Sequence, residues 1–242
     1  SLEGVSIDAR GDTRGGHVLV GGEFQGKGTE RRAVETTIDA NSVIRADATA
    51  KGDAGTVVVW SDNQTNFAGT ITATGPAGGG DGGNVEVSGK ENLEYGGIVR
   101  IGAVKGRGGS LLLDPQNITV DAAGAASAAQ VAAFNTNANT DRTVSNATLD
   151  AVGGNVTLQA NNDITVNQAV NLTTGGATLT MQAGRSILLN QSITTNNGAI
   201  TLIANDVTDG SANTVQAANR SNGTALITFA SGVTINAGSA NI

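Results

Sequence analysis

The sequence contains no cysteine, a single histidine, two prolines and only 2% aromatic residues. Without cysteine, the chain has neither a disulfide framework nor thiolate metal sites. One histidine, His17, cannot form a histidine-rich metal site or a Cys-His pair, and we expect it to flank a strand in solvent. We therefore expect no metal site, no cofactor and no catalytic residue.

Charge and long apolar segments are also scarce. Charged residues make up 14% of the chain and the net charge is -7, without a basic patch that would attract nucleic acid or an anionic membrane. The longest apolar run, around residues 111–113, is far too short to cross a bilayer. The first residues lack a basic start and an apolar core, so any export signal is expected outside this sequence.

Short apolar triplets that follow a glycine recur along the chain, which has 35 glycines. HVLV, TVVVW and NVEV are examples, at residues 17–20, 56–60 and 84–87. Their spacing of about 21 to 45 residues is typical of a solenoid repeat. One residue of each triplet marks an equivalent position in successive coils: Val18, Val57, Val85, Leu111, Val156, Leu179, Ile200 and Ile227.

Further β-type segments lie between these triplets, such as GTITA at residues 69–73 and GIVRIG at residues 97–102. Three short strands per turn, each turning alternate residues inward, predict an all-β fold of the parallel β-helix (solenoid) type. Asn at the corners would allow amide ladders between coils. An antiparallel sandwich or barrel is the alternative, but it relies on two-residue Asn-Gly or Asp-Gly turns and on large aromatic residues.

The composition changes near residue 115. Residues 1–115 are Gly-rich and charged, whereas residues 146–242 are rich in Asn and Thr. Residues 116–145 interrupt the β pattern, and Ser127 followed by Gln130 predicts a capping box for a short helix near residues 127–135. We expect one continuous solenoid in which two sets of coils flank an irregular insertion.

The glycine-rich stretch GPAGGGDGGNVEVSG, residues 75–89, allows three interpretations. A phosphate loop is disfavoured because no Gly-Lys-Ser/Thr follows and the next element is a strand. A calcium-binding β-roll repeat needs tandem copies, and this single copy has Asn84 where Asp is required. A long corner explains every residue: Val85 and Val87 then enter the core, and Glu86 points to water.

Residues 44–120 resemble the segment that follows the secretion domain in filamentous-haemagglutinin-like exoproteins of two-partner secretion. The resemblance lies in GTVVVWSD (55–62), GGDGGNVEVSG (79–89) and above all GGSLLLDPQNITV (108–120). It implies a right-handed parallel β-helix, export through a partner outer-membrane barrel, and a role as an adhesin or large surface exoprotein. The Asn-Pro-Asn-containing secretion domain of that family is missing, so transporter recognition is not assigned to this chain.

Arg10, Gly11 and Asp12 form a tripeptide that is a candidate cell-binding site, because its Gly-rich setting would leave it exposed. The same three residues also suit an ordinary corner in a chain rich in Gly and Asp. Attachment of cells that is unaffected by Asp12→Glu would end the cell-binding hypothesis.

The function predicted from the sequence is that of a structural shaft segment in a secreted or surface-exposed Gram-negative adhesin, and not of an enzyme. The expected partners are a host-cell receptor or glycan, or another bacterial or biofilm surface component. An outer-membrane transporter would serve the parent protein through a domain absent here, and neither nucleic acid nor membrane insertion is expected. A carbohydrate-active β-helix enzyme is the alternative, which requires acids clustered on one face. Ice binding by rows of Thr is a third, although their spacing is irregular.

Overall fold

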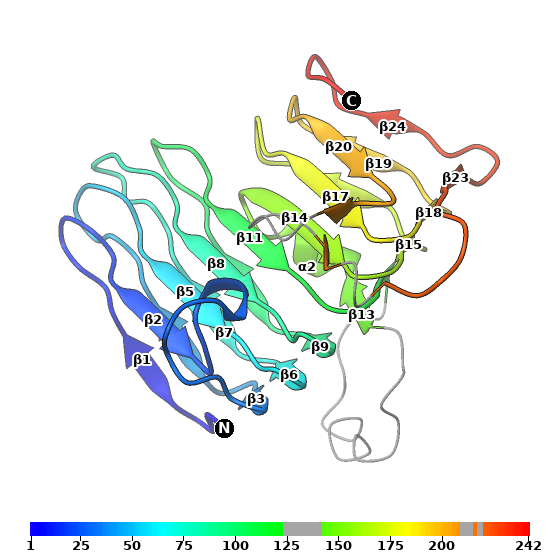
Figure 1. Cartoon of the computed structure of the whole chain (residues 1–242). Helices are drawn as coiled ribbons and strands as arrows, with labels where there is room; N and C mark the ends of the chain where they lie inside the picture. Colours follow the sequence, from blue (N-terminus) through cyan, green and yellow to red (C-terminus); the bar gives the residue numbers. More distant parts are fainter. Residues whose placement is uncertain (123–141, 209–214, 217–219) are drawn as a thin grey trace.

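The computed structural model describes residues 1–122, 142–208, 215–216 and 220–242. Their strands wind into coils that stack in one direction, with the two termini at opposite ends of the stack (Figure 1). The strand pairs in this part of the chain are all parallel. Two neighbouring parallel strands must be joined by a long connection, and in this chain the remainder of each coil is that connection. The predicted all-β, parallel β-helix fold is confirmed.

One side of the coil is a sheet that runs through nearly the whole described chain, and we call it the long sheet. Its strand order follows the sequence from β2 to β20. The equivalent positions predicted from the sequence form one row in it, from Val18 to Ile200. Its strands are β2 (His17–Val20), β5 (Thr56–Val59), β8 (Asn84–Val87), β11 (Ser110–Leu113), β14 (Asn155–Ala160), β17 (Leu179–Ala183) and β20 (Ile200–Ile203).

The other two sides of the coil are built from shorter strands. The second sheet contains β3 (Glu35–Ile38), β6 (Gln64–Phe67), β9 (Asn92–Tyr95), β13 (Arg142–Ser145), β12 (Ile118–Asp121), β15 (Ile164–Val166), β18 (Ile187–Leu189) and β23 (Ile227–Phe229), in that spatial order. The third side contains β1 (Ser6–Asp8), β4 (Val43–Arg45), β7 (Thr70–Thr72) and β10 (Ile98–Arg100), then β16 (Val170–Leu172), β19 (Ile193–Thr195) and β24 (Ile235–Asn236). A separate pair joins β21 (Val207–Thr208) to β22 (Val215–Gln216).

The last of the predicted equivalent positions, Ile227, was assigned wrongly. Ile227 lies in β23 and pairs with Ile187 of the second sheet, not with Ile200 of the long sheet. All sides of the coil alternate inward and outward residues with the same period of two. An apolar triplet after glycine therefore marks a strand without revealing which side of the coil the strand occupies.

The change in composition near residue 115 leaves the long sheet intact, because β11 pairs directly with β14. The other two sides do change there. In the second sheet β13 lies between β9 and β12, and on the third side α2 (Asn146–Asp150) packs against β16 where a strand would otherwise lie. The helix predicted near residues 127–135 lies outside the described residues.

The interior is a narrow stack of mainly aliphatic rows. Val57, Leu113 and Leu158 are fully buried in the long sheet. The second sheet contributes an aromatic pair, Phe67 and Tyr95, whose ring centroids are 5.5 Å apart. Each coil therefore buries apolar surface against the coils above and below it, which makes stability a sum of neighbour contacts along the stack.

Corner side chains link successive coils by accepting hydrogen bonds from backbone N–H groups. The Asp53 carboxylate accepts from the N–H of Asp81 at 2.8 Å, and the Asp81 carboxylate accepts from the N–H of Arg107 at 2.8 Å. The Asn190 amide donates to the Asn167 side-chain oxygen at 2.9 Å, so an amide contact of the predicted kind joins these two coils. These bonds satisfy backbone groups at corners where the sheets are interrupted.

Candidate functional site

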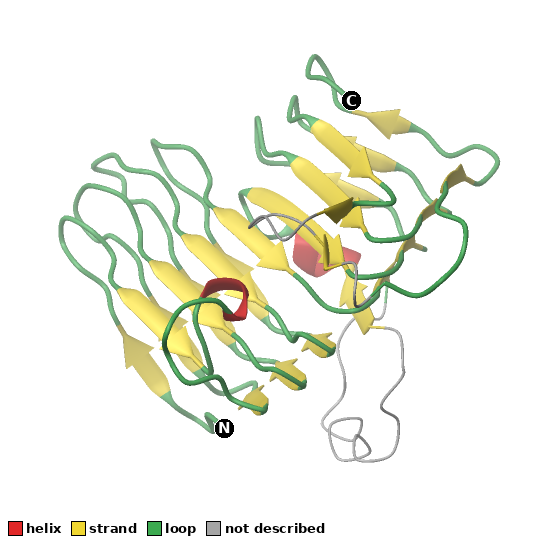
Figure 2. Ribbon diagram, in the orientation of Figure 1, coloured by secondary structure: helices red, strands yellow, loops and turns green. Residues whose placement is uncertain are grey.

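A loop covers part of the outer face of the long sheet, and we call residues 21–33 the strap. The strap follows the end of β2 and includes the 3-10 turn η1 (Phe24–Gly26). In Figure 2 this turn is the left-hand of the two red elements, and it lies over the strands of the long sheet. Gly26 has φ +62, and a Cβ there would lie 2.4 Å from the Trp60 ring. The strap therefore packs so closely on Trp60 that a side chain at position 26 would not fit.

Polar contacts fix the strap on the sheet. The Gln25 N–H donates to the Glu86 carboxyl at 2.9 Å, and the Gln25 side-chain amide donates to Gln159 at 3.3 Å. The Lys27 ammonium donates to the Gln25 side-chain oxygen at 3.0 Å. Within the strap, the Glu23 carboxylate accepts two backbone N–H bonds. Gln25 is therefore the residue that ties the strap to two different strands, β8 and β14.

Glu86 does not point into water as its alternation with Val85 and Val87 predicts. Its side chain is on the outer face of the sheet, but the residue is only 1% exposed because the strap covers it. The two valines enter the core as expected. The prediction was wrong for Glu86 because alternation fixes the face on which a side chain lies and not what covers that face.

Glu86 lies beneath the strap, and its carboxyl group is close enough to that of Asp114 for the two charges to interact. Burial raises the pKa of Glu86 to about 7, and the N–H of Gln25 partly offsets this rise. Burial also raises the pKa of Asp114 to about 7, and the nearby charge of Glu86 adds to the shift. Near neutral pH each of the two groups is therefore partly protonated, whereas an exposed carboxyl would be ionised.

A groove of about 540 Å³ runs beside the strap on the outer face of the long sheet. Phe24 and Gln25 of the strap form one wall, and outward side chains of β8, β11 and β14 form the floor. Glu86 and Asp114 are not part of its lining. The groove is thus an open surface feature, whereas the Glu86 carboxyl is covered.

A second hollow, of about 460 Å³, shares Thr56, Asn84 and Ser110 with this groove. It is more polar, and its lining includes Arg14, His17, Asp53, Asp81 and Arg107 with several glycines between them. His17 is exposed at the start of β2, as predicted. The Asp81 carboxylate pairs with Arg107 at 2.8 Å, so part of this charge is already neutralised within the hollow.

The structure places the tripeptide Arg10, Gly11 and Asp12 at a corner, with both charged side chains exposed. The Arg10 guanidinium makes a two-point contact with Asp8, and the Asp12 carboxylate accepts a hydrogen bond from Thr49 at 2.7 Å. Gly11 forms a parallel bridge with the next coil. The tripeptide is thus part of the coil stack, and its role in cell binding stays a hypothesis.

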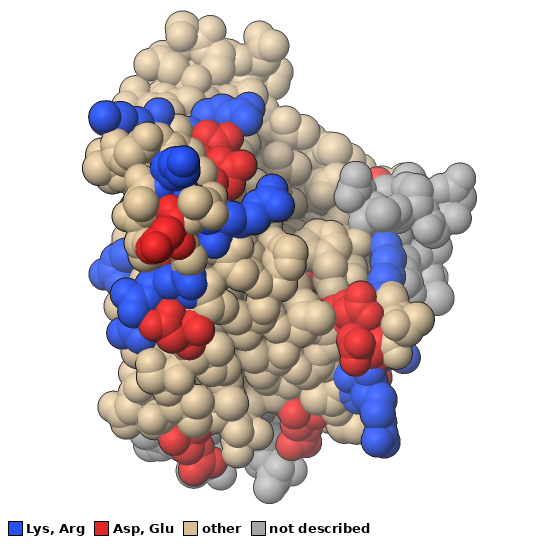
Figure 3. Space-filling model, turned by 90° about the vertical axis from the view of Figure 1, so that its left-hand side faces the viewer, with Lys and Arg blue, Asp and Glu red and all other residues tan. Residues whose placement is uncertain are grey.

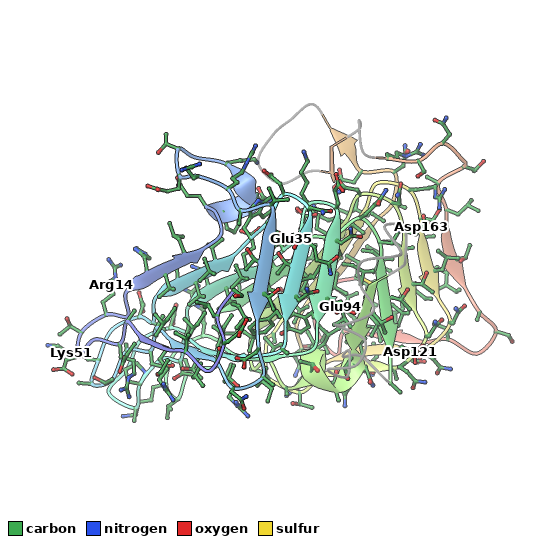
Figure 4. All side chains as sticks on the ribbon, turned by 90° about the horizontal axis from the view of Figure 1, so that it is seen from below. Arg14, Glu35, Lys51, Glu94, Asp121 and Asp163 are labelled. Atoms are coloured by element: carbon green, nitrogen blue, oxygen red, sulfur yellow. The ribbon has the colours of Figure 1, made fainter. Side chains whose placement is uncertain are left out.

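Acids and bases elsewhere are dispersed. Figure 4 shows Glu35 and Glu94 on strands of the second sheet, well separated from Arg14 and Lys51 at another corner. In Figure 3 positive and negative side chains adjoin one another, and no large area of one sign is visible on that face. Across the described ranges no group of three or more His, Cys, Asp or Glu side chains is arranged to hold a metal ion. In the same ranges, no helix has the length and apolar character needed to cross a bilayer.

The chain matches no family model and no curated protein. The functional argument therefore rests on the fold and on the outer face of the long sheet. Sequence reasoning missed the strap and the burial of Glu86 beneath it. One signal could have indicated them: the interval from Val18 to Val57 exceeds the two that follow, to Val85 and to Leu111, so this coil carries extra residues.

Proposed function

We propose that this chain is a shaft segment of a secreted or surface-exposed bacterial adhesin, which holds a binding region away from the cell. The observation that carries the proposal is the uninterrupted row of parallel strands in the long sheet, from β2 to β20. Such a row transmits force through backbone hydrogen bonds and stacked aliphatic layers of many coils. The resemblance of residues 44–120 to filamentous-haemagglutinin-like exoproteins points the same way, and it implies export of the parent protein through an outer-membrane transporter.

A carbohydrate-active enzyme is the second candidate, because Glu86 and Asp114 are two neighbouring carboxyl groups with raised pKa values. Such pairs serve as acid and base in glycoside hydrolysis. The strap covers Glu86, which is 1% exposed, so a sugar chain has no path to that carboxyl in this structure. The shaft role therefore has the better support. Cleavage of a polysaccharide that is abolished by Glu86→Gln would reverse this preference.

Removal of one whole coil tests the shaft proposal. Residues 179–199 form one coil, β17 to β19, and Ile200 would take the place of its partner Leu179 in the long sheet. In the parent protein expressed by its own bacterium, we expect this deletion to leave export and cell attachment close to the wild-type level. A shaft shortened by about 4.8 Å still presents its binding region.

Deletion of residues 179–189 alone is the matched control, because it removes β17 and β18 but leaves β19 without its coil. We expect this variant to lose export or to be degraded. Should the whole-coil variant be folded and exported but unable to attach to cells, the coil itself would carry the binding function, and the shaft proposal would be wrong.

A further inference from the structure

The groove beside the strap has a neutral lining. Among the described residues that line it, none carries an ionisable side chain. Its wall is the ring of Phe24, which is 49% exposed, and its floor includes Leu112. Hydroxyl and amide side chains supply the rest. A concave surface with an apolar platform and several fixed polar groups is the usual chemistry of a small-molecule or glycan site.

The polar groups of the groove repeat with the coils. Thr56, Asn84 and Ser110 are in register on β5, β8 and β11, and each projects from the outer face. Thr157 and Thr180 continue the polar lining on β14 and β17, in a row displaced by two residues. The groove therefore offers hydroxyl or amide groups about every 4.8 Å along the stack.

The strap wall is already fixed in place. Gln25 donates its side-chain amide to Gln159, which donates in turn to Gln182 at 3.4 Å, and Gln25 also binds Glu86 through its N–H. These contacts join the strap to β8 and β14 and hold Phe24 above the floor of the groove. A ligand that enters the groove would not have to order this wall first, which lowers the entropic cost of binding.

We propose that this groove binds a linear, neutral oligosaccharide that lies along the stack, with about one sugar per coil. An extended chain of pyranose units advances by about 5 Å per sugar, close to the roughly 4.8 Å between coils, whereas an extended peptide advances by about 3.4 Å per residue. A pyranose has a C–H face that stacks on an aromatic ring, here Phe24, and edge hydroxyls that suit Thr, Asn and Ser side chains.

The charges of the groove and of the whole chain favour a neutral sugar over an acidic one. The lining carries no cation to pair with a uronic acid or a sulfate, and the chain as a whole has a net charge of -7, which repels polyanions. The inference goes beyond the shaft role, because it gives this segment a ligand of its own. If it fails, the shaft proposal stands. The whole-coil deletion also removes Thr180 and Gln182 of the groove, so the point variants below, which leave the coils complete, test the groove by itself.

Calorimetric titration of the 242-residue chain tests the groove. The probes are β-1,4-linked oligomers of glucose, mannose and N-acetylglucosamine with two to six units, and tetragalacturonic acid serves as the acidic comparison. We expect at least one neutral series to bind, with affinity that increases from two to about four or five sugars and then levels off, since the lining spans the coils from β5 to β17.

Phe24→Ala should weaken this binding by about tenfold, because it removes the stacking platform. Phe229→Ala is the matched control, since Phe229 is 55% exposed on β23 and does not line the groove, and it should leave the affinity unchanged. Ser110→Trp, which places a bulky ring in the groove from an exposed position, should abolish binding. Circular dichroism confirms that each variant is folded.

Three results would overturn the proposal: no neutral oligomer binds, tetragalacturonic acid binds in preference to all of them, or Phe24→Ala and Ser110→Trp bind as tightly as the unchanged chain. An affinity that is the same for two and for six sugars would contradict the arrangement along the stack.

Discussion

Replacing Gly82 by alanine should destabilise the β-helix by about 3 kcal/mol or more, one of the largest effects expected for a single methyl group. A Cβ at this position would lie 1.8 Å from the carbonyl oxygen of Ile101 and 2.5 Å from the backbone nitrogen of Gly109. Both are backbone atoms, so no side-chain rotation can relieve the overlap. The coil corner would have to move away from its neighbour, which weakens the sheet hydrogen bonds on both sides.

Gly102→Ala is the matched control for this prediction. Gly102 lies close to the same corner, but the nearest atom to its added Cβ would be the Gly153 carbonyl oxygen at 3.6 Å, an ordinary contact. Urea unfolding followed by circular dichroism should show a lower midpoint for the Gly82 variant and a nearly unchanged midpoint for the Gly102 variant. Equal midpoints for the two would show that close backbone approach at the corners does not limit stability.

The second large effect concerns pH. Glu86→Gln should stabilise the chain by about 3 kcal/mol at pH 8.5 and leave its stability unchanged near pH 4, because the ionised carboxyl is the form that burial disfavours. The pKa of Glu86 is raised in the folded state from 4.5 to about 7. The stabilising contribution of its protonated form is therefore complete below about pH 4.5 and is lost as the pH rises through about 7.

The amide of glutamine imitates the protonated acid: it is neutral and can still accept the Gln25 N–H bond. Removing the charge of Glu86 also removes one cause of the raised pKa of Asp114, so the two contributions are coupled and do not add. Urea unfolding at several pH values from 4 to 8.5 measures the effect. The curves of wild type and Glu86→Gln should converge at low pH and separate as the pH rises.

Glu35→Gln is the control for the pH experiment, since Glu35 is exposed at the start of β3. It should leave the pH dependence of the free energy of unfolding as in wild type. If Glu86→Gln behaves like Glu35→Gln at every pH, the carboxyl of Glu86 is solvated in the folded state, and the strap does not cover it in solution.

Much of the fold could be predicted because its signals are local. Val18, Val57 and Val85 each follow a glycine within a short alternating segment, and they occupy one row in three successive coils. The local pattern does not identify the sheet to which a strand belongs, since Ile227 has the same pattern but lies in the second sheet. The candidate site was harder to predict from the sequence. Residues 21–33 have the composition of a polar loop, and nothing in them indicates which face of the coil they cover.

The sequence by itself determined that the chain forms parallel coils with aliphatic rows inside and Gly, Asn and Asp at the corners, because a period of two and the conformational freedom of glycine act over a few residues. The tertiary structure alone decided which part of the outer face is covered. Gln25 and Glu86 are 61 positions apart in the sequence, and their contact turns an outward carboxylate into a buried acid. Burial depends on the path of a distant loop, and local alternation carries no information about that path.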